Sequence, residues 1–242
     1  TGAINLNGVI SGAGSLNIIN TSTNAATVVK LAGNNTFTGA TSVTGGTLQL
    51  DLATSNTNKL ANAAALTLNR AIVNITGPAS GGVQEEVGNL VLSGGFNRIT
   101  RSAGTGTMRL NQITRNAGGV LDMGAAGLAD TDRTNTNGII GGWATINGTD
   151  WAINATGAGN GLLNALAAGS YTTQNNVANW TNAAQNLFVN DATTGTLSGT
   201  KTINSLKIDN GTGTTAINVA AQATGSTLVI DSGGIIVRGT GT

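Results

Sequence analysis

Residues 31–50 read LAGNNTFTGATSVTGGTLQL. The stretch ends on Leu48-Gln49-Leu50, an apolar-x-apolar pattern that buries one face of a short strand, because successive side chains of a strand point to opposite sides. Gly45 and Gly46 precede this strand and form a corner, since glycine adopts a positive φ without steric cost. The stretch therefore predicts short strands joined by a tight corner.

The same apolar-x-apolar pattern recurs along the chain. Further pairs are Ile4/Leu6, Leu16/Ile18, Val29/Leu31, Leu66/Leu68, Leu90/Leu92, Met108/Leu110, Leu206/Ile208 and Leu228/Ile230. Leu66 follows Leu48 by 18 residues (66 − 48), and Leu90 follows Leu66 by 24 (90 − 66), which indicates a repeat of roughly 20 residues. A repeat of this length is typical of solenoids, in which each turn pairs with the turns on either side.

The composition of the 242-residue chain favours strands and turns over helices. It holds 37 glycines and one proline, and 39% of its residues are hydrophobic. Glycine loses more backbone entropy in a helix than any other residue does. Only 3% of the residues are aromatic, fewer than the core of a flat antiparallel sandwich would need. A narrow coil filled with stacked Leu, Ile and Val side chains fits this composition better.

Few side chains carry charge or reactive groups. Charged residues make up 9%, the net charge is +1, and histidine and cysteine are absent. The basic surface that nucleic-acid binding requires is therefore missing, as are thiolate metal ligands and a Ser-His-Asp triad. No apolar run approaches the length of a membrane span. We predict a protein that is not an enzyme, with no nucleic-acid partner and no direct membrane span.

The expected fold is all-β, a parallel β-solenoid that forms a single domain over residues 1–242 and belongs to a longer repeat protein. Between residues 124 and 197 the apolar-x-apolar spacing is lost, so this region is predicted to be a loop-rich insertion. One short helical turn is expected at residues 161–168. Neither end carries polar capping residues, and we expect the end turns to stack on flanking repeats or on another copy of the chain.

An acidic pair in the 124–197 region is the candidate cation site. Asp130 and Asp132, followed by Asn135 and Asn137, offer oxygen ligands to Ca²⁺, although the glycine and the terminal Glu of an EF-hand loop are missing. The alternative is an ordinary solvated loop. The same two carboxylates are the candidates for acid catalysis if the chain is instead a polysaccharide lyase or hydrolase.

Four aromatic residues in the same region form the candidate ligand surface. Trp143, Trp151, Trp180 and Tyr171 could stack on sugar rings, because aromatic faces attract the apolar faces of sugars. The alternative is that they fill a local hydrophobic core. Surface glycans are accordingly one predicted class of partner.

Five arginines lie within residues 98–133. They are Arg98, Arg101, Arg109, Arg115 and Arg133. If turns stack here, Arg98 and Arg115 would share a face and form a patch for anionic glycans. The alternative is that all five are solvated residues of the outer face, paired in part with Glu85 and Glu86.

Residues 31–50 resemble the autotransporter-associated β-strand repeat, whose pattern is L-x-G-x-N-T-[YF]-T-G-x-T-x-[VI]-x-x-G-T-L-x-[LV]. The matching positions include Asn35-Thr36-Phe37-Thr38-Gly39 and the final Leu48-Gln49-Leu50. Residues 4–16 are similar to the segment that leads into this repeat, and residues 141–152 are similar to a segment of such proteins. The resemblance transfers no catalytic residue.

This resemblance implies a right-handed parallel β-helix in a long bacterial surface protein. We therefore expect a structural segment of a secreted surface fibre, stalk or coat, which associates end to end with itself or with flanking repeats. A glycan- or surface-binding adhesin is the first alternative, and a polysaccharide lyase or hydrolase is the second. The expected location is extracellular, on the bacterial cell surface.

Overall fold

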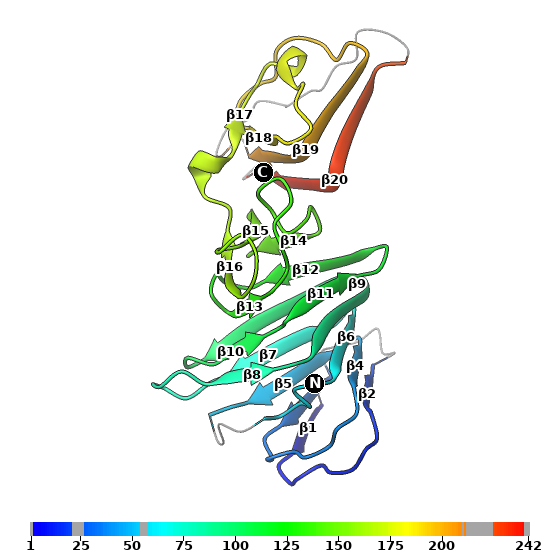
Figure 1. Cartoon of the computed structure of the whole chain (residues 1–242), viewed down its shortest axis with the longest axis vertical. Helices are drawn as coiled ribbons and strands as arrows, with labels where there is room; N and C mark the ends of the chain where they lie inside the picture. The colour runs from blue at the N-terminus through cyan, green and yellow to red at the C-terminus, as the bar shows by residue number, and fades with distance from the viewer. Residues whose placement is uncertain (1, 21–26, 54–57, 210, 212–224, 240–242) are drawn as a thin grey trace. The chain divides into compact units, whose positions relative to one another are not determined.

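The computed structural model describes residues 2–20, 27–53, 58–209, 211 and 225–239. The chain forms a parallel β-solenoid of about eight turns (Figure 1), as the apolar pattern predicted, and these residue ranges contain no α-helix. It divides into two compact units. The N-terminal unit comprises Thr1–Thr134 and Asn154–Asn164, and the C-terminal unit comprises Asn135–Ile153 and Ala165–Thr242.

The N-terminal unit winds its strands onto three faces. The first face holds β1 (Ala3–Leu6), β3 (Val28–Leu31), β5 (Thr47–Asp51), β7 (Ile72–Thr76), the second half of β9 (Asn89–Ala103) and β12 (Gly119–Met123). The second face holds β2 (Leu16–Ile19), β4 (Thr41–Thr44), β6 (Ala65–Asn69), the first half of β9 and β11 (Gln112–Arg115). The third face holds β8 (Gln84–Glu86), β10 (Thr107–Arg109) and β13 (Ala129–Thr131). All these neighbours are parallel, so each full turn visits the second, first and third faces in that order.

Columns of aliphatic side chains run through the interior, one residue per turn. The column on the first face is Ile4, Val29, Leu48, Val73, Ile99 and Met123, matched in register by the strand pairing. The members from Leu48 to Met123 are fully buried, whereas Ile4 in the first described turn is 53% exposed. Each buried aliphatic residue contributes about 1.5–3 kcal/mol relative to exposure, so the stack gains stability with every turn.

Successive apolar pairs alternate between faces. Leu48 on β5 pairs with Val73 on β7, 25 residues later (73 − 48), while Leu66 on β6 pairs with Leu90 on β9. Leu48 and Leu66 therefore belong to different columns. The predicted repeat of roughly 20 residues was too short, because it mixed steps from face to face with steps along one column.

The corner between the second and first faces explains two of the glycines. Gly45 and Gly46 both have φ of 70°. A Cβ atom on Gly45 would lie 2.5 Å from the carbonyl oxygen of Asn20 in the preceding turn. At the same corner one turn later, Arg70 also adopts a positive φ, of 53°. The corner keeps one backbone shape from turn to turn, and the close approach of the turns excludes a side chain at Gly45.

The expectation of a helical turn at residues 161–168 is wrong. Gly161–Ala165 form strand β16, and the 3₁₀ turn η1 (Ala168–Ser170) begins only afterwards. The burial pattern alternates as in a strand, with Leu162 exposed and Leu163 buried. Part of β16 pairs antiparallel with β13, through Asp130 opposite Leu162. Sheet pairing outweighs the helix propensity of this Leu- and Ala-rich segment.

The C-terminal unit has a hairpin and a second parallel stack. In the hairpin, β14 (Ala144–Ile146) pairs antiparallel with β15 (Asp150–Asn154). In the stack, β17 (Thr172–Thr173), β18 (Asn186–Val189), β19 (Thr200–Asp209) and β20 (Thr227–Arg238) pair parallel in sequence order. The second 3₁₀ turn is η2 (Val177–Asn179). The 124–197 region thus contains several strands as well as loops.

Candidate functional site

Arg109 is the centre of a polar network in the N-terminal unit. Its two terminal nitrogens donate to different carboxylates, Nη1 to Asp130 at 2.7 Å and Nη2 to Asp132 at 2.7 Å. Nη1 also donates to the side-chain oxygen of Asn160. The second oxygen of Asp130 accepts a 2.6 Å hydrogen bond from Gln84. Strands β8, β10 and β13 of the third face are therefore tied together by side chains as well as by backbone pairing.

The guanidinium supplies the positive charge beside the acidic pair. Burial lowers the pKa of Arg109, but the hydrogen bonds to Asp130 and Asp132 outweigh this effect and raise the pKa above its ordinary value. A Ca²⁺ ion at Asp130 and Asp132 would have to displace this permanently charged group. In the described ranges, no three acidic, His or Cys side chains gather as metal ligands.

A loop fastened by Asn154 borders this network. The buried side-chain amide of Asn154 donates to the carbonyl oxygens of Thr131 at 3.0 Å and Gly159 at 2.7 Å. Its oxygen accepts hydrogen bonds from the backbone nitrogen and the hydroxyl of Thr156. A Cβ atom on Gly161 would lie 2.0 Å from the Asn154 oxygen, so only glycine fits there. Residues 154–161 are consequently held in one conformation by hydrogen bonds and close packing.

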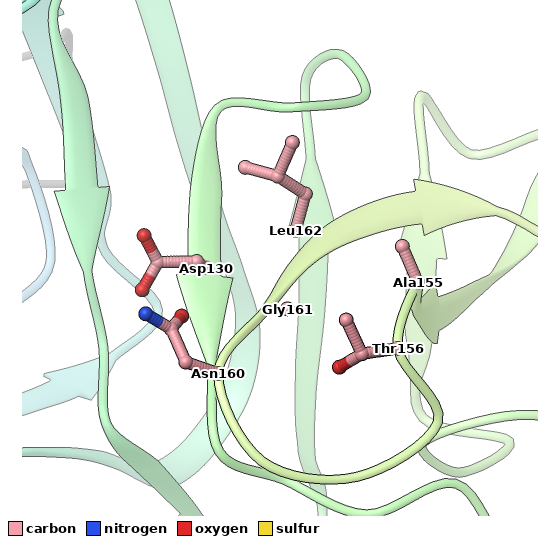
Figure 2. Close-up of a pocket in the computed structure, with 6 residues that line it drawn as sticks. All are labelled: Asp130, Ala155, Thr156, Asn160, Gly161 and Leu162. Atoms are coloured by element: carbon pink, nitrogen blue, oxygen red, sulfur yellow. The ribbon is translucent and has the colours of Figure 1, made fainter.

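A hollow of about 350 Å³ opens between the loop and the network. Its lining residues are Asp130, Ala155, Thr156, Asn160, Gly161 and Leu162. Figure 2 shows the Asp130 carboxylate and the Asn160 amide beside each other, with Leu162 above them and Thr156 across the loop. The hollow therefore combines hydrogen-bonding groups with an exposed aliphatic side chain.

The four aromatic residues predicted as a ligand surface are buried in the C-terminal unit, and three of them belong to its hydrophobic cores. Trp151 and Trp180 are almost completely buried, and Trp143 and Tyr171 are each 8% exposed. Trp151 and Tyr171 share one core with Ile139, Leu166 and Ile236. Trp180 belongs to a second core, and its indole nitrogen donates to a backbone carbonyl at 3.1 Å. In this structure all four side chains are therefore largely covered by protein.

Tyr171 and Asp150 belong to an ionic cluster beside one of these cores. Lys207 Nζ lies 2.6 Å from Asp150 Oδ1, and the Tyr171 hydroxyl donates to the same oxygen at 3.2 Å. Lys207 Nζ also lies over the rings of Tyr171 and Phe188, at 5.0 and 5.3 Å from their centroids. Burial acts to raise the pKa of Asp150, but hydrogen bonds from Lys207 and Thr149 outweigh it, so the pKa is lowered. The cluster stabilises packing within this unit.

The five arginines do not gather into one patch. Arg98 pairs in register with first-face strands β7 and β12, whereas Arg115 lies on β11 of the second face. The expectation that these two share a face is therefore wrong. Arg98 contacts Asp122 at 3.2 Å, and Arg115 donates to the carbonyl of Gly119.

The N-terminal unit also buries two ionisable side chains: Lys59, which was not predicted as a site residue, and Glu85, which was expected only as a partner of the arginines. Lys59 and Glu85 are both fully buried. The Glu85 carboxylate accepts hydrogen bonds from the backbone nitrogens of Lys59, at 2.9 and 3.0 Å, and of Leu60, at 2.6 Å. Lys59 Nζ in turn donates to the carbonyls of Ala32 and Gly33. These hydrogen bonds link three consecutive turns. Residues 33, 59 and 85 are separated by 26 positions each (59 − 33 and 85 − 59), about one turn, and this spacing was the only sign of the contact in the sequence.

Stacked parallel turns with an aliphatic interior place this chain in the class of parallel β-solenoids. An alignment of length 152 that covers 60% of the chain is 34% identical to the adhesin BmaC autotransporter of Brucella suis biovar 1 (strain 1330). The chain is thus a distant homologue of an autotransporter adhesin, and it spans 4% of that relative's length. No protein-family profile and no solved structure matches the chain.

None of the helices in the described ranges has the length and apolar character needed to cross a bilayer.

Proposed function

We propose that the chain is a structural segment of a secreted bacterial surface protein, in which its stacked turns form part of a rigid stalk, fibre or coat. The observation that carries this proposal is the uninterrupted column from Ile4 to Met123, whose inner members are fully buried. Such a column stiffens a solenoid along its axis, because bending it would open packed interfaces between turns.

Two sequence relationships support a surface location. The homology to an autotransporter adhesin connects the chain to a protein named for attachment. Residues 31–50 also resemble the autotransporter-associated β-strand repeat, and the structure gives them alternating second- and first-face strands with a glycine corner. The role is mechanical and needs no catalytic group.

Antibody labelling of intact cells tests this role. Antibodies raised against the purified chain are expected to label unpermeabilised cells of the source bacterium, and external protease should remove the label. Labelling that appears only after permeabilisation would overturn the proposal. A cytoplasmic protein detected in parallel shows whether the cells stayed intact.

End-to-end stacking is part of the same proposal. Among the described strands, β1 pairs only with β3 and β2 only with β4, so both leave one edge open. Ile4 lies at the open end of its column and is 53% exposed. An open edge of this kind pairs with a further parallel strand, supplied by a flanking turn or by another copy. In sedimentation velocity, the apparent mass of the chain should rise with its concentration. The Ile4→Lys variant should remain at the mass of the monomer. A parent chain that is a monomer at all concentrations would refute self-stacking.

A further inference from the structure

The hollow beside Arg109 has the ordered walls and the size of a binding site. The loop at residues 154–161 is preorganised, since buried Asn154 bonds to Gly159 and Thr156 within it and the backbone packs too closely at Gly161 to admit a side chain. A site whose walls are already ordered loses little conformational entropy when a ligand binds. The hollow of about 350 Å³ falls in the size range of small-molecule sites.

The polar groups of the hollow match hydroxyl groups. Asn160 is exposed, and its amide nitrogen makes no hydrogen bond to another described residue, so it has two hydrogens to donate. The Asp130 carboxylate beside it uses one hydrogen bond on each oxygen, to Arg109 and Gln84, which leaves acceptor capacity on both. A donor next to an acceptor suits a pair of neighbouring hydroxyls, because each hydroxyl both donates and accepts.

The apolar part of the hollow matches the carbon face of a sugar ring. Leu162 is 47% exposed, unlike its neighbour Leu163, which is fully buried. Ala155 adds a second aliphatic group to the lining. An exposed aliphatic side chain next to hydrogen-bonding groups gives a ligand with one apolar and one polar face a defined orientation.

The charges around the hollow select against anions. Arg109 is the cation of the network, and its charge is shared by the two carboxylates of Asp130 and Asp132. The three groups together carry a net charge of −1. An anionic ligand would meet this excess negative charge, while the Arg109 guanidinium is already paired with both carboxylates.

We propose that the hollow formed by Asp130, Thr156, Asn160 and Leu162 binds a neutral saccharide. Asn160 donates to a ring hydroxyl, Asp130 accepts from the neighbouring hydroxyl, and Leu162 packs against the carbon face of the ring. This binding is separate from the scaffold role, and either can fail without the other. A weak site of this kind gains strength when the chain is displayed in many copies on a surface.

Nuclear magnetic resonance titration of the whole chain tests the site. The probes are methyl α-mannopyranoside, methyl β-galactopyranoside and N-acetylglucosamine, with glucuronic acid and N-acetylneuraminic acid as anionic counterparts. At least one neutral probe is expected to shift the Asn160 side-chain amide and the Leu162 methyl signals with a millimolar Kd. The anionic probes should leave these signals unchanged.

Variants separate this site from unspecific contact. Asn160→Ala and Leu162→Ser should each weaken binding of that probe about 5- to 10-fold, as expected for the loss of one good contact. Asn116→Ala changes an exposed asparagine and Phe96→Ala an exposed apolar side chain elsewhere on the N-terminal unit, and both should leave the Kd unchanged. Unchanged spectra with every neutral probe, preferential binding of the anionic probes, or equal effects of the control variants would overturn the proposal.

Discussion

Replacing Ile99 by Ala is expected to destabilise the N-terminal unit by about 3 kcal/mol, whereas the same change at Ile4 costs less than about 1 kcal/mol. Both residues belong to one column, but Ile99 is fully buried between Val73 and Met123, and Ile4 is half exposed in the first described turn. Truncating a buried side chain removes its transfer free energy and leaves a cavity. Urea unfolding followed by circular dichroism measures both losses.

The comparison has a built-in control, because the chemical change is identical at the two positions. A similar loss at Ile4 and Ile99 would mean that position in the column does not determine burial. A loss below about 1 kcal/mol at Ile99 would mean that the column is not packed as described.

Stability is expected to fall by about 3 kcal/mol as the pH rises from 4 to 8, and Glu85→Gln should remove this dependence. Burial raises the pKa of Glu85 to about 7, although the hydrogen bonds from Lys59 and Leu60 act to lower it. The folded chain therefore binds a proton more tightly than the unfolded chain does. The contribution is fully present below the ordinary pKa of 4.5 and is lost as the pH rises through 7.

Urea midpoints collected across this pH range test the effect. Glu86→Gln changes the adjacent, less buried carboxylate and should keep the slope of the parent chain. Asp150 has a lowered pKa and affects stability in a different pH range. Its contribution to stability is present above its ordinary pKa of 3.8 and is lost only as the pH falls below that value. A slope that persists in Glu85→Gln would assign the pH dependence to other groups.

The fold class could be predicted from the sequence because apolar-x-apolar pairs report strands locally. The length of a turn could not be predicted as easily, because pairs on two faces look alike in sequence. Leu48 and Leu66 are both leucines at the start of such a pair, yet only strand pairing shows that they face different columns. The strand at Gly161–Ala165 was missed because its Leu- and Ala-rich composition favours a helix, whereas its strand conformation depends on sheet pairing, in part with β13.

The candidate site was predicted only in part. Asp130 was selected for its carboxylate, but its partner Arg109 lies 21 residues earlier, and only the parallel register of β10 and β13 brings the two residues side by side. Asn154 and Asn160 were not selected, since asparagine is abundant in the chain and their roles depend on the loop conformation. The burial of Trp151 and Trp180 follows from tertiary packing that a single sequence does not encode locally.

Stacking of parallel turns in the described register is the central claim, and distances between spin labels test it most directly. The chain has no cysteine, so labels can be attached to cysteines placed on the outward-facing column of Asn5, Gln49, Asn74 and Thr100. The label at Asn5 is predicted to lie about 10, 14 and 19 Å from labels at Gln49, Asn74 and Thr100, because each turn adds about 4.8 Å. Distances that do not rise in this order would contradict the stacked coil.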